Sequence, residues 1–114
     1  MSERGPQEFL ADMRAAIVRI QSYTSGNTYA QFLADSRTQD AVVRNIEILS
    51  EAAKRLPATL TAAHPDVAWK SIAGMRDKLV HDYFGVNVDI LWDVVTTKLP
   101  TLLPQIDRII KEGT

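Results

Sequence analysis

The fold of this chain is decided by residues 36–56, which read SRTQDAVVRNIEILSEAAKRL. Within this stretch, Ser36 and Gln39 have the spacing of a capping box, which predicts a helix start, and Pro57 marks the end. Apolar side chains then recur in steps of four and three, along one narrow seam of an α-helix. They are Val42, Ile46, Leu49, Ala53 and Leu56. This seam is typical of a helix in a bundle.

Turn residues divide the rest of the chain into further helical segments. Helices are predicted over about 6–23, 28–33 and 66–84, and residues 57–65 are predicted to form a loop with at most one short turn. Gly85 ends the third of these helices, and Asn87 caps the next. Pro100 and Pro104 predict a break or kink around Lys98–Thr101, where a last helix restarts. No stretch alternates with period two, so we predict an all-α, antiparallel bundle of four or five helices.

Length and composition limit the possible classes of protein. At 114 residues, the chain is expected to form a single domain over residues 1–114. It has no cysteine, so disulfides and thiolate metal sites are excluded, and neither a signal peptide nor a membrane span is recognisable. We therefore expect a cytoplasmic protein. The formal net charge is -1, so no global basic field would hold nucleic acid.

One segment carries chemistry that a core does not need, RDKLVHDY at residues 76–83. Arg76, His81 and Tyr83 combine a permanent cation, a group that titrates near neutral pH and a phenol, which together suggest chemistry on a phosphate. On an ideal helix Tyr83 shares the face of Arg76, whereas His81 does not. Either the helix distorts near its end or a second chain completes the site. Asp77 and Lys78 stand about one turn before His81, where Asp77 can orient the imidazole and Lys78 can contact an RNA backbone.

Two copies of the segment 76–83 would supply the acid, the base and the cations that RNA cleavage without a metal requires. The 2′-OH attacks the adjacent phosphate while one group removes its proton and another protonates the leaving oxygen. Histidine suits both roles, and arginine suits the charge on the phosphorane. A two-fold axis near residues 66–84 would bring two copies of each into one cleft. By spacing alone, the alternative is a surface histidine and a half-buried tyrosine without function.

The stretch WKSIAGMRDKLVHDYF at residues 69–84 resembles the HepT-like family of the HEPN superfamily. The resemblance extends over nearly the whole chain, through the turn at 23–26, Gln39-Asp40-Ala41-Val42, Glu51-Ala52-Ala53-Lys54 and the closing Leu99-Pro100-x-Leu102. It implies a HEPN-type bundle that forms a homodimer and acts as a metal-independent endoribonuclease toxin, with no cofactor. Arg76 and His81 match the catalytic pair. A minimal nucleotidyltransferase antitoxin would transfer AMP to Tyr83.

Two residues depart from the family pattern. Asp77 replaces the usual Asn after the arginine, and its charge either weakens RNA binding or orients His81. Ser50 replaces a frequent Gly, which affects helix packing more than chemistry. A noncatalytic helical subunit that binds a nucleotidyltransferase or a nucleotide is the alternative function, favoured by the near-neutral charge and by Asp77.

Overall fold

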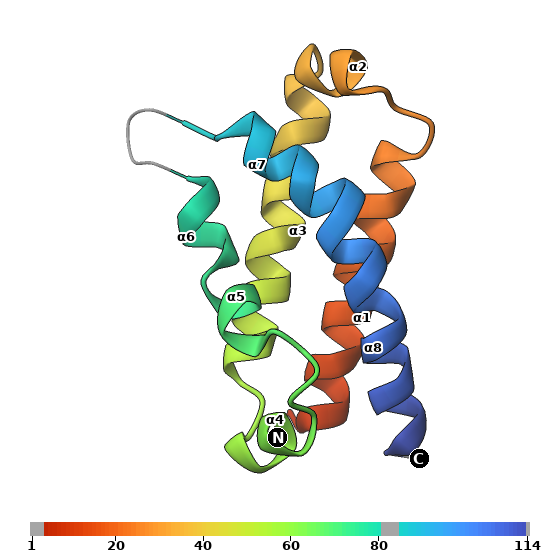
Figure 1. Cartoon of the computed structure of the whole chain (residues 1–114), viewed down its shortest axis with the longest axis vertical. Helices are drawn as coiled ribbons and strands as arrows, with labels where there is room; N and C mark the ends of the chain where they lie inside the picture. The colour runs from red at the N-terminus through yellow and green to blue at the C-terminus, as the bar shows by residue number, and fades with distance from the viewer. Residues whose placement is uncertain (1–3, 81–84, 114) are drawn as a thin grey trace.

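The computed structural model describes residues 4–80 and 85–113, and Figure 1 shows their arrangement. Three long helical stretches and several short helices make up the chain, and no strand occurs in the described part. The elements are α1 Pro6–Thr24, α2 Tyr29–Leu33, α3 Ser36–Lys54, α4 Ala58–Ala63, α5 Trp69–Ala73, α6 Met75–Leu79, α7 Val88–Asp93, η2 Val94–Lys98 and α8 Leu99–Glu112. The expected all-α bundle is confirmed.

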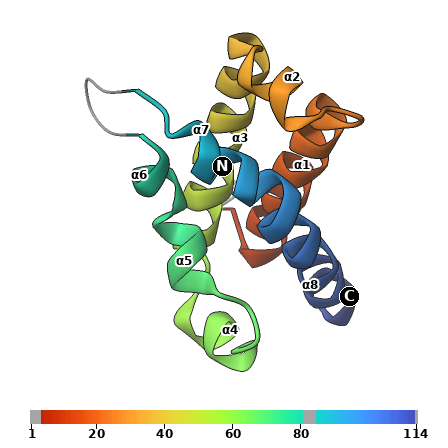
Figure 2. The same cartoon turned by 45° about the horizontal axis from the view of Figure 1, so that its top comes forward.

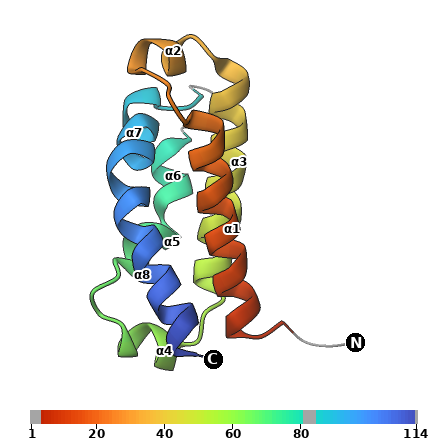
Figure 3. The same cartoon turned by 90° about the vertical axis from the view of Figure 1, so that its right-hand side faces the viewer.

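The long elements run antiparallel around one hydrophobic core. α1 packs most extensively on α3, α8 packs on α1, and α5 and α6 cover another side of α3 (Figures 1 and 3). α2 caps one end of the bundle and α4 lies at the other, as the tilted view also shows (Figure 2). The predicted seam of α3 is buried throughout, with Val42, Ile46 and Leu49 fully inaccessible. Its burial is the main source of stability for such a helix.

The start of α3 differs from the prediction by one residue. Asp35, not Ser36, is the N-cap, and its carboxylate accepts hydrogen bonds from the backbone N–H and the hydroxyl of Thr38, at 3.1 and 2.7 Å. Hydrogen bonds from Thr38 lower the pKa of Asp35. The Gln39 side chain instead donates to the carbonyls of Phe32 and Leu33 at the end of α2. The capping box was wrong because a carboxylate one residue earlier serves the N–H groups.

α2 is held against α7 by aromatic contacts and one hydrogen bond. The rings of Phe32 and Trp92 lie 5.1 Å apart, and Tyr29 meets Trp92 edge to face at 6.0 Å. The Tyr29 hydroxyl donates to the Asp89 carboxylate, and this bond raises the pKa of the phenol. These contacts fix the short helix α2 over the end of the core.

The helix predicted over 66–84 is two short helices, and this prediction was wrong in its extent. α5 ends at Ala73, Gly74 interrupts the helix, and α6 ends at Leu79. Val80 is extended and forms an isolated antiparallel bridge with Val86, while the Asn87 N–H donates to the Leu79 carbonyl at 2.9 Å. Gly85 has a φ of +78°, which glycine adopts without strain. The chain therefore turns out of the helix within the motif.

A π-turn replaces the break that Pro100 predicted. The chain remains helical from Val88 to Glu112, with η2 between α7 and α8. Pro100 has no N–H to donate to Thr96, and its ring crowds that carbonyl in an α-turn. In the wider turn, the Leu99 N–H instead bonds to the Val94 carbonyl. Of the expected break or kink, the break is wrong, because one wide turn accommodates the proline, and the last helix begins at Leu99 as expected.

Within the described residues, we find no helix with the length and apolar character that a membrane crossing requires.

Candidate functional site

Arg76 lies on α6 beside a cleft of about 250 Å³ between α6 and α3. Its side chain is 45% exposed and therefore accessible to a ligand. Asp77 from α6 also lines the cleft, and the opposite wall comes from one face of α3. That wall consists of Glu47, Ser50, Glu51 and Lys54. We call this space the Arg76 cleft.

The charges in the Arg76 cleft are mixed. Two of them, Arg76 and Lys54, are cations, and three, Asp77, Glu47 and Glu51, are carboxylates. Arg76 lies 3.6 Å from Asp77, and Lys54 lies 3.6 Å from Glu51. Such long, exposed ion pairs contribute about 0–1 kcal/mol, so a phosphate can displace the carboxylate from Arg76 at small cost. The described residues of one chain do not form a basic pocket here.

Ser50 fixes the segment that carries Arg76. Its buried hydroxyl donates a 2.8 Å hydrogen bond to the carbonyl of Ile72, in the last turn of α5. Ser50, which replaces the family's frequent Gly, therefore joins α3 to α5. This contact agrees with the expectation that the replacement affects helix packing.

Lys78 lies on the other side of α6 from Arg76 and Asp77. It lines a separate small cavity with residues of α5, α7 and η2. The structure therefore brings Arg76 and Asp77 together in the cleft but does not bring Lys78 to them. Lys78 is two positions after Arg76, about 200° around an α-helix, so these two side chains leave nearly opposite faces of α6.

His81 and Tyr83 lie outside the described residues. In the described part of the motif, α6 ends at Leu79 and Val80 is extended. The expected placement of His81 and Tyr83 relative to Arg76 stays a prediction, and so does the completion of the site by a second chain.

Two carboxylates of the cleft were not identified as site residues from the sequence. Glu47 was not singled out, and Glu51 was noted only within the Glu51-Ala52-Ala53-Lys54 stretch of the family resemblance. In the sequence, Glu51 follows Glu47 by four residues and Lys54 follows Glu51 by three. This spacing puts all three side chains on the side of α3 opposite the buried seam. This pattern alone is typical of a solvated helix face. In residues 4–80 and 85–113, no three His, Asp or Glu side chains cluster so as to hold a metal ion.

Comparison with known proteins identifies the family. The family model described as ribonuclease HepT-like matches residues 13–109. A Methanocaldococcus jannaschii protein named as a candidate RNase is 40% identical over 112 residues, covering 98% of this chain and 93% of that protein. A Thermococcus cleftensis protein named "Probable ribonuclease HepT" is 38% identical over 109 residues, covering 96% and 99%.

A further relative, from Caldanaerobacter subterraneus and also named as a candidate RNase, is 42% identical over 87 residues, which covers 76% of this chain and 78% of its own length. No solved structure matched the chain. The family match spans most of the sequence and includes both α3, which forms one wall of the Arg76 cleft, and the motif segment. The chain therefore belongs to the HepT-like ribonuclease family.

Proposed function

We propose that this protein is a metal-independent endoribonuclease and the toxin of a toxin–antitoxin pair. The observation that carries the proposal is an exposed Arg76 at an open cleft in a chain of the HepT-like family; among the described residues its ion pair is with Asp77, at 3.6 Å. The relatives' names as ribonucleases support the same activity.

In this mechanism the RNA supplies its own nucleophile. The 2′-oxygen forms a bond to the adjacent phosphorus, and the bond from phosphorus to the 5′-oxygen breaks, leaving a cyclic phosphate. His81 takes the proton from the 2′-OH or gives one to the departing 5′-oxygen. Arg76 stabilises the added negative charge on the phosphorane through its N–H groups. Asp77 holds Arg76 or orients His81 in this scheme.

A homodimer supplies the second acid–base group. One chain carries one histidine in the motif, whereas proton removal and proton donation are two tasks. The mixed charge of the Arg76 cleft supports this, because a second copy would add another guanidinium. A minimal nucleotidyltransferase would silence the enzyme by joining AMP to Tyr83, which adds an anion and bulk at the site.

The test compares wild type, Arg76→Gln and Arg14→Gln for RNA cleavage, with and without EDTA. Arg14 is a matched control, since it is exposed and also pairs with a carboxylate, that of Asp107, outside the cleft. We expect cleavage by wild type and Arg14→Gln in EDTA, and a loss of at least about 100-fold with Arg76→Gln. Intact RNA with wild type, or activity that EDTA abolishes, would refute the proposal. Intact mass after coexpression with the nucleotidyltransferase would reveal the Tyr83 adduct.

A noncatalytic subunit that binds a nucleotidyltransferase or a nucleotide is the second candidate. The three carboxylates of the Arg76 cleft favour it, because they oppose the binding of an RNA phosphate. Substituting His81 by Ala separates the two candidates. Lost cleavage with an intact partner complex supports catalysis, and a lost complex supports the binding role.

A further inference from the structure

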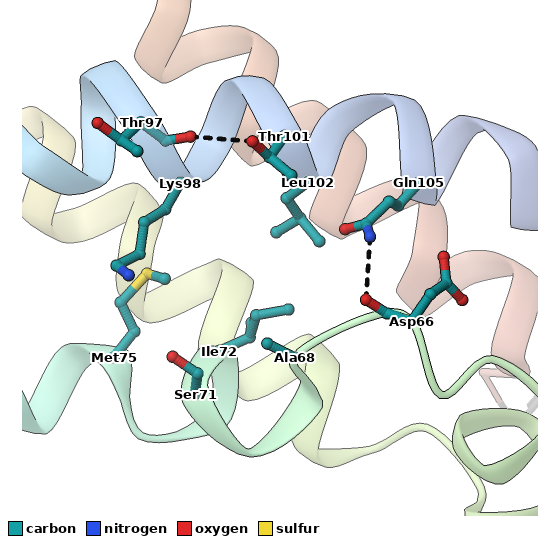
Figure 4. Close-up of a pocket in the computed structure, with 10 residues that line it drawn as sticks. All are labelled: Asp66, Ala68, Ser71, Ile72, Met75, Thr97, Lys98, Thr101, Leu102 and Gln105. Atoms are coloured by element: carbon teal, nitrogen blue, oxygen red, sulfur yellow. Dashed lines mark hydrogen bonds between the residues drawn. The ribbon is translucent and has the colours of Figure 1, made fainter.

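A second concavity lies between α5–α6 and the η2–α8 rod (Figure 4). Its volume is about 270 Å³. Ile72, Met75 and Leu102 form an apolar floor and are almost fully buried. The polar side chains around this floor are those of Asp66, Ser71, Thr97, Lys98, Thr101 and Gln105. An apolar surface bordered by a few polar groups is the usual composition of a small-ligand site.

A smaller cavity of about 70 Å³ adjoins the first and brings in a second lysine. The two cavities share Ser71, Met75 and Lys98, and the smaller one adds Lys78 from α6. We call the joined space the Lys78–Lys98 groove. Because Lys78 and Lys98 come from different elements, the tertiary fold, and not a local run of basic residues, creates this pair of cations.

The positive charge of the groove is uncompensated in the described part of the chain. Neither Lys78 nor Lys98 forms an ion pair with residues 4–80 or 85–113, whereas Arg76 pairs with Asp77. The one carboxylate among the described lining residues, Asp66, stands at the far end and is held by Arg108 at 2.8 Å. An anionic ligand would therefore meet two ammonium groups that no described carboxylate pairs with, beside an apolar floor.

The π-turn explains why Lys98 faces this groove. In an α-turn residue 98 would stand over Val94, which is buried. In η2 the Leu99 N–H bonds to the Val94 carbonyl, so the fully buried Leu99 takes that place. Lys98 is exposed, and in Figure 4 its side chain extends across the groove toward Met75. Single π-turns inside helices occur frequently at functional sites.

We propose that the Lys78–Lys98 groove binds a nucleotide of the single-stranded RNA substrate beyond the cleavage site. This inference rests on the proposed ribonuclease function. The two ammonium groups would contact a phosphate as point charges. Ile72, Met75 and Leu102 would pack against the base. The hydroxyls of Ser71 and Thr97, which make no hydrogen bond to another described residue, would be free to contact the ribose.

The experiment measures binding of a single-stranded 2′-O-methyl RNA, which cannot be cleaved through its 2′-oxygen, over a series of salt concentrations. The variants are Lys78→Gln, Lys98→Gln and Lys98→Arg. The matched control is Lys70→Gln, an exposed lysine on α5 that does not line the groove. Each Gln variant is expected to weaken binding several-fold and to reduce the slope of log K against log salt by about 0.7, whereas Lys98→Arg and Lys70→Gln keep the wild-type slope.

Several results would overturn the groove assignment. They are unchanged slopes in both Gln variants, an equal loss with Lys70→Gln, or binding of AMP but not of RNA with the same lysine dependence. Loss of a homodimer in the Gln variants, seen by sedimentation, would identify the groove as a protein interface instead. The uncleavable RNA keeps this test separate from catalysis. If RNA binding depends on these lysines but wild type cleaves no RNA, the proposed ribonuclease function is refuted while RNA binding by the Lys78–Lys98 groove is supported.

Discussion

The hydrogen bond from Ser50 to Ile72 is predicted to contribute measurable stability, and Ser50→Ala tests it. The substitution removes a buried hydroxyl that donates at 2.8 Å and leaves the Ile72 carbonyl without this partner. A buried polar group left unsatisfied costs about 1–3 kcal/mol. Alanine also favours an α-helix over serine by up to about 0.7 kcal/mol, which partly hides the loss.

Ser22→Ala is the matched control, because Ser22 is an exposed residue within α1. It undergoes the same chemical change and the same gain in helix propensity, so subtracting its effect isolates the hydrogen bond. For 114 residues, an unfolding entropy of about 2.1 cal/mol/K per residue gives about 0.24 kcal/mol/K. The predicted cost of about 1–3 kcal/mol therefore corresponds to about 4–12 °C in Tm.

The assay is thermal unfolding followed by circular dichroism, with urea unfolding as a second measurement. Ser50→Ala should melt about 4–12 °C below Ser22→Ala. A difference below about 2 °C, with equal urea midpoints, would show that Ser50 does not hold α5 on α3. RNA cleavage by the same variant, measured well below its Tm, would then show whether the position of Arg76 depends on this bond.

Three further outcomes are expected. A hydrogen bond from Arg108 lowers the pKa of Asp66 from 3.8, so the ionised carboxylate stabilises the fold above about pH 3.8. Asp66→Asn should therefore lower the Tm at pH 7, and its Tm should approach that of wild type as the pH falls through the pKa of Asp66 in the folded protein. The hydrogen bond from Tyr29 to Asp89 on α7 raises the pKa of the phenol from 10.0. Tyr29→Phe should therefore lower the Tm near neutral pH, and the two Tm values should converge as the pH rises through the pKa of Tyr29 in the folded protein. A Tm difference that stays constant at high pH would contradict this. Leu99→Ala, at a fully buried position, should cost about 2–5 kcal/mol in urea unfolding, whereas Leu33→Ala, 51% exposed, should stay within about 0.5 kcal/mol.

Apolar spacing predicted most of the fold. The seam of α3 and the limits of α1 follow from side chains that must be buried together, so local pattern and tertiary packing agree there. The Pro100 region was predicted less well, since a proline signals lost hydrogen bonding but not how the backbone adjusts. A broken helix and a widened turn both satisfy that constraint.

The candidate site was harder to predict because it depends on contacts between elements. The resemblance indicated Arg76, and the structure places it at an open cleft. The end of α6 within the motif depends on the pairing of Val80 with Val86, a contact that helix propensity does not contain. Glu47 is a candidate site residue because α6 lies across the cleft from it, and Lys98 is one because α5 lies across the groove from it. Neither arrangement can be read from the local sequence.

The wide turn at Val94–Lys98 also bears on how sequences of this family should be aligned. A relative that lacks one residue in this turn can close it to ordinary helical geometry and still present the same side chains before and after it. An alignment that forbids gaps inside helices would then shift every position of α8 by one, and would match buried leucines with solvent-facing residues. Allowing a single-residue gap at this point preserves the correspondence of the two halves.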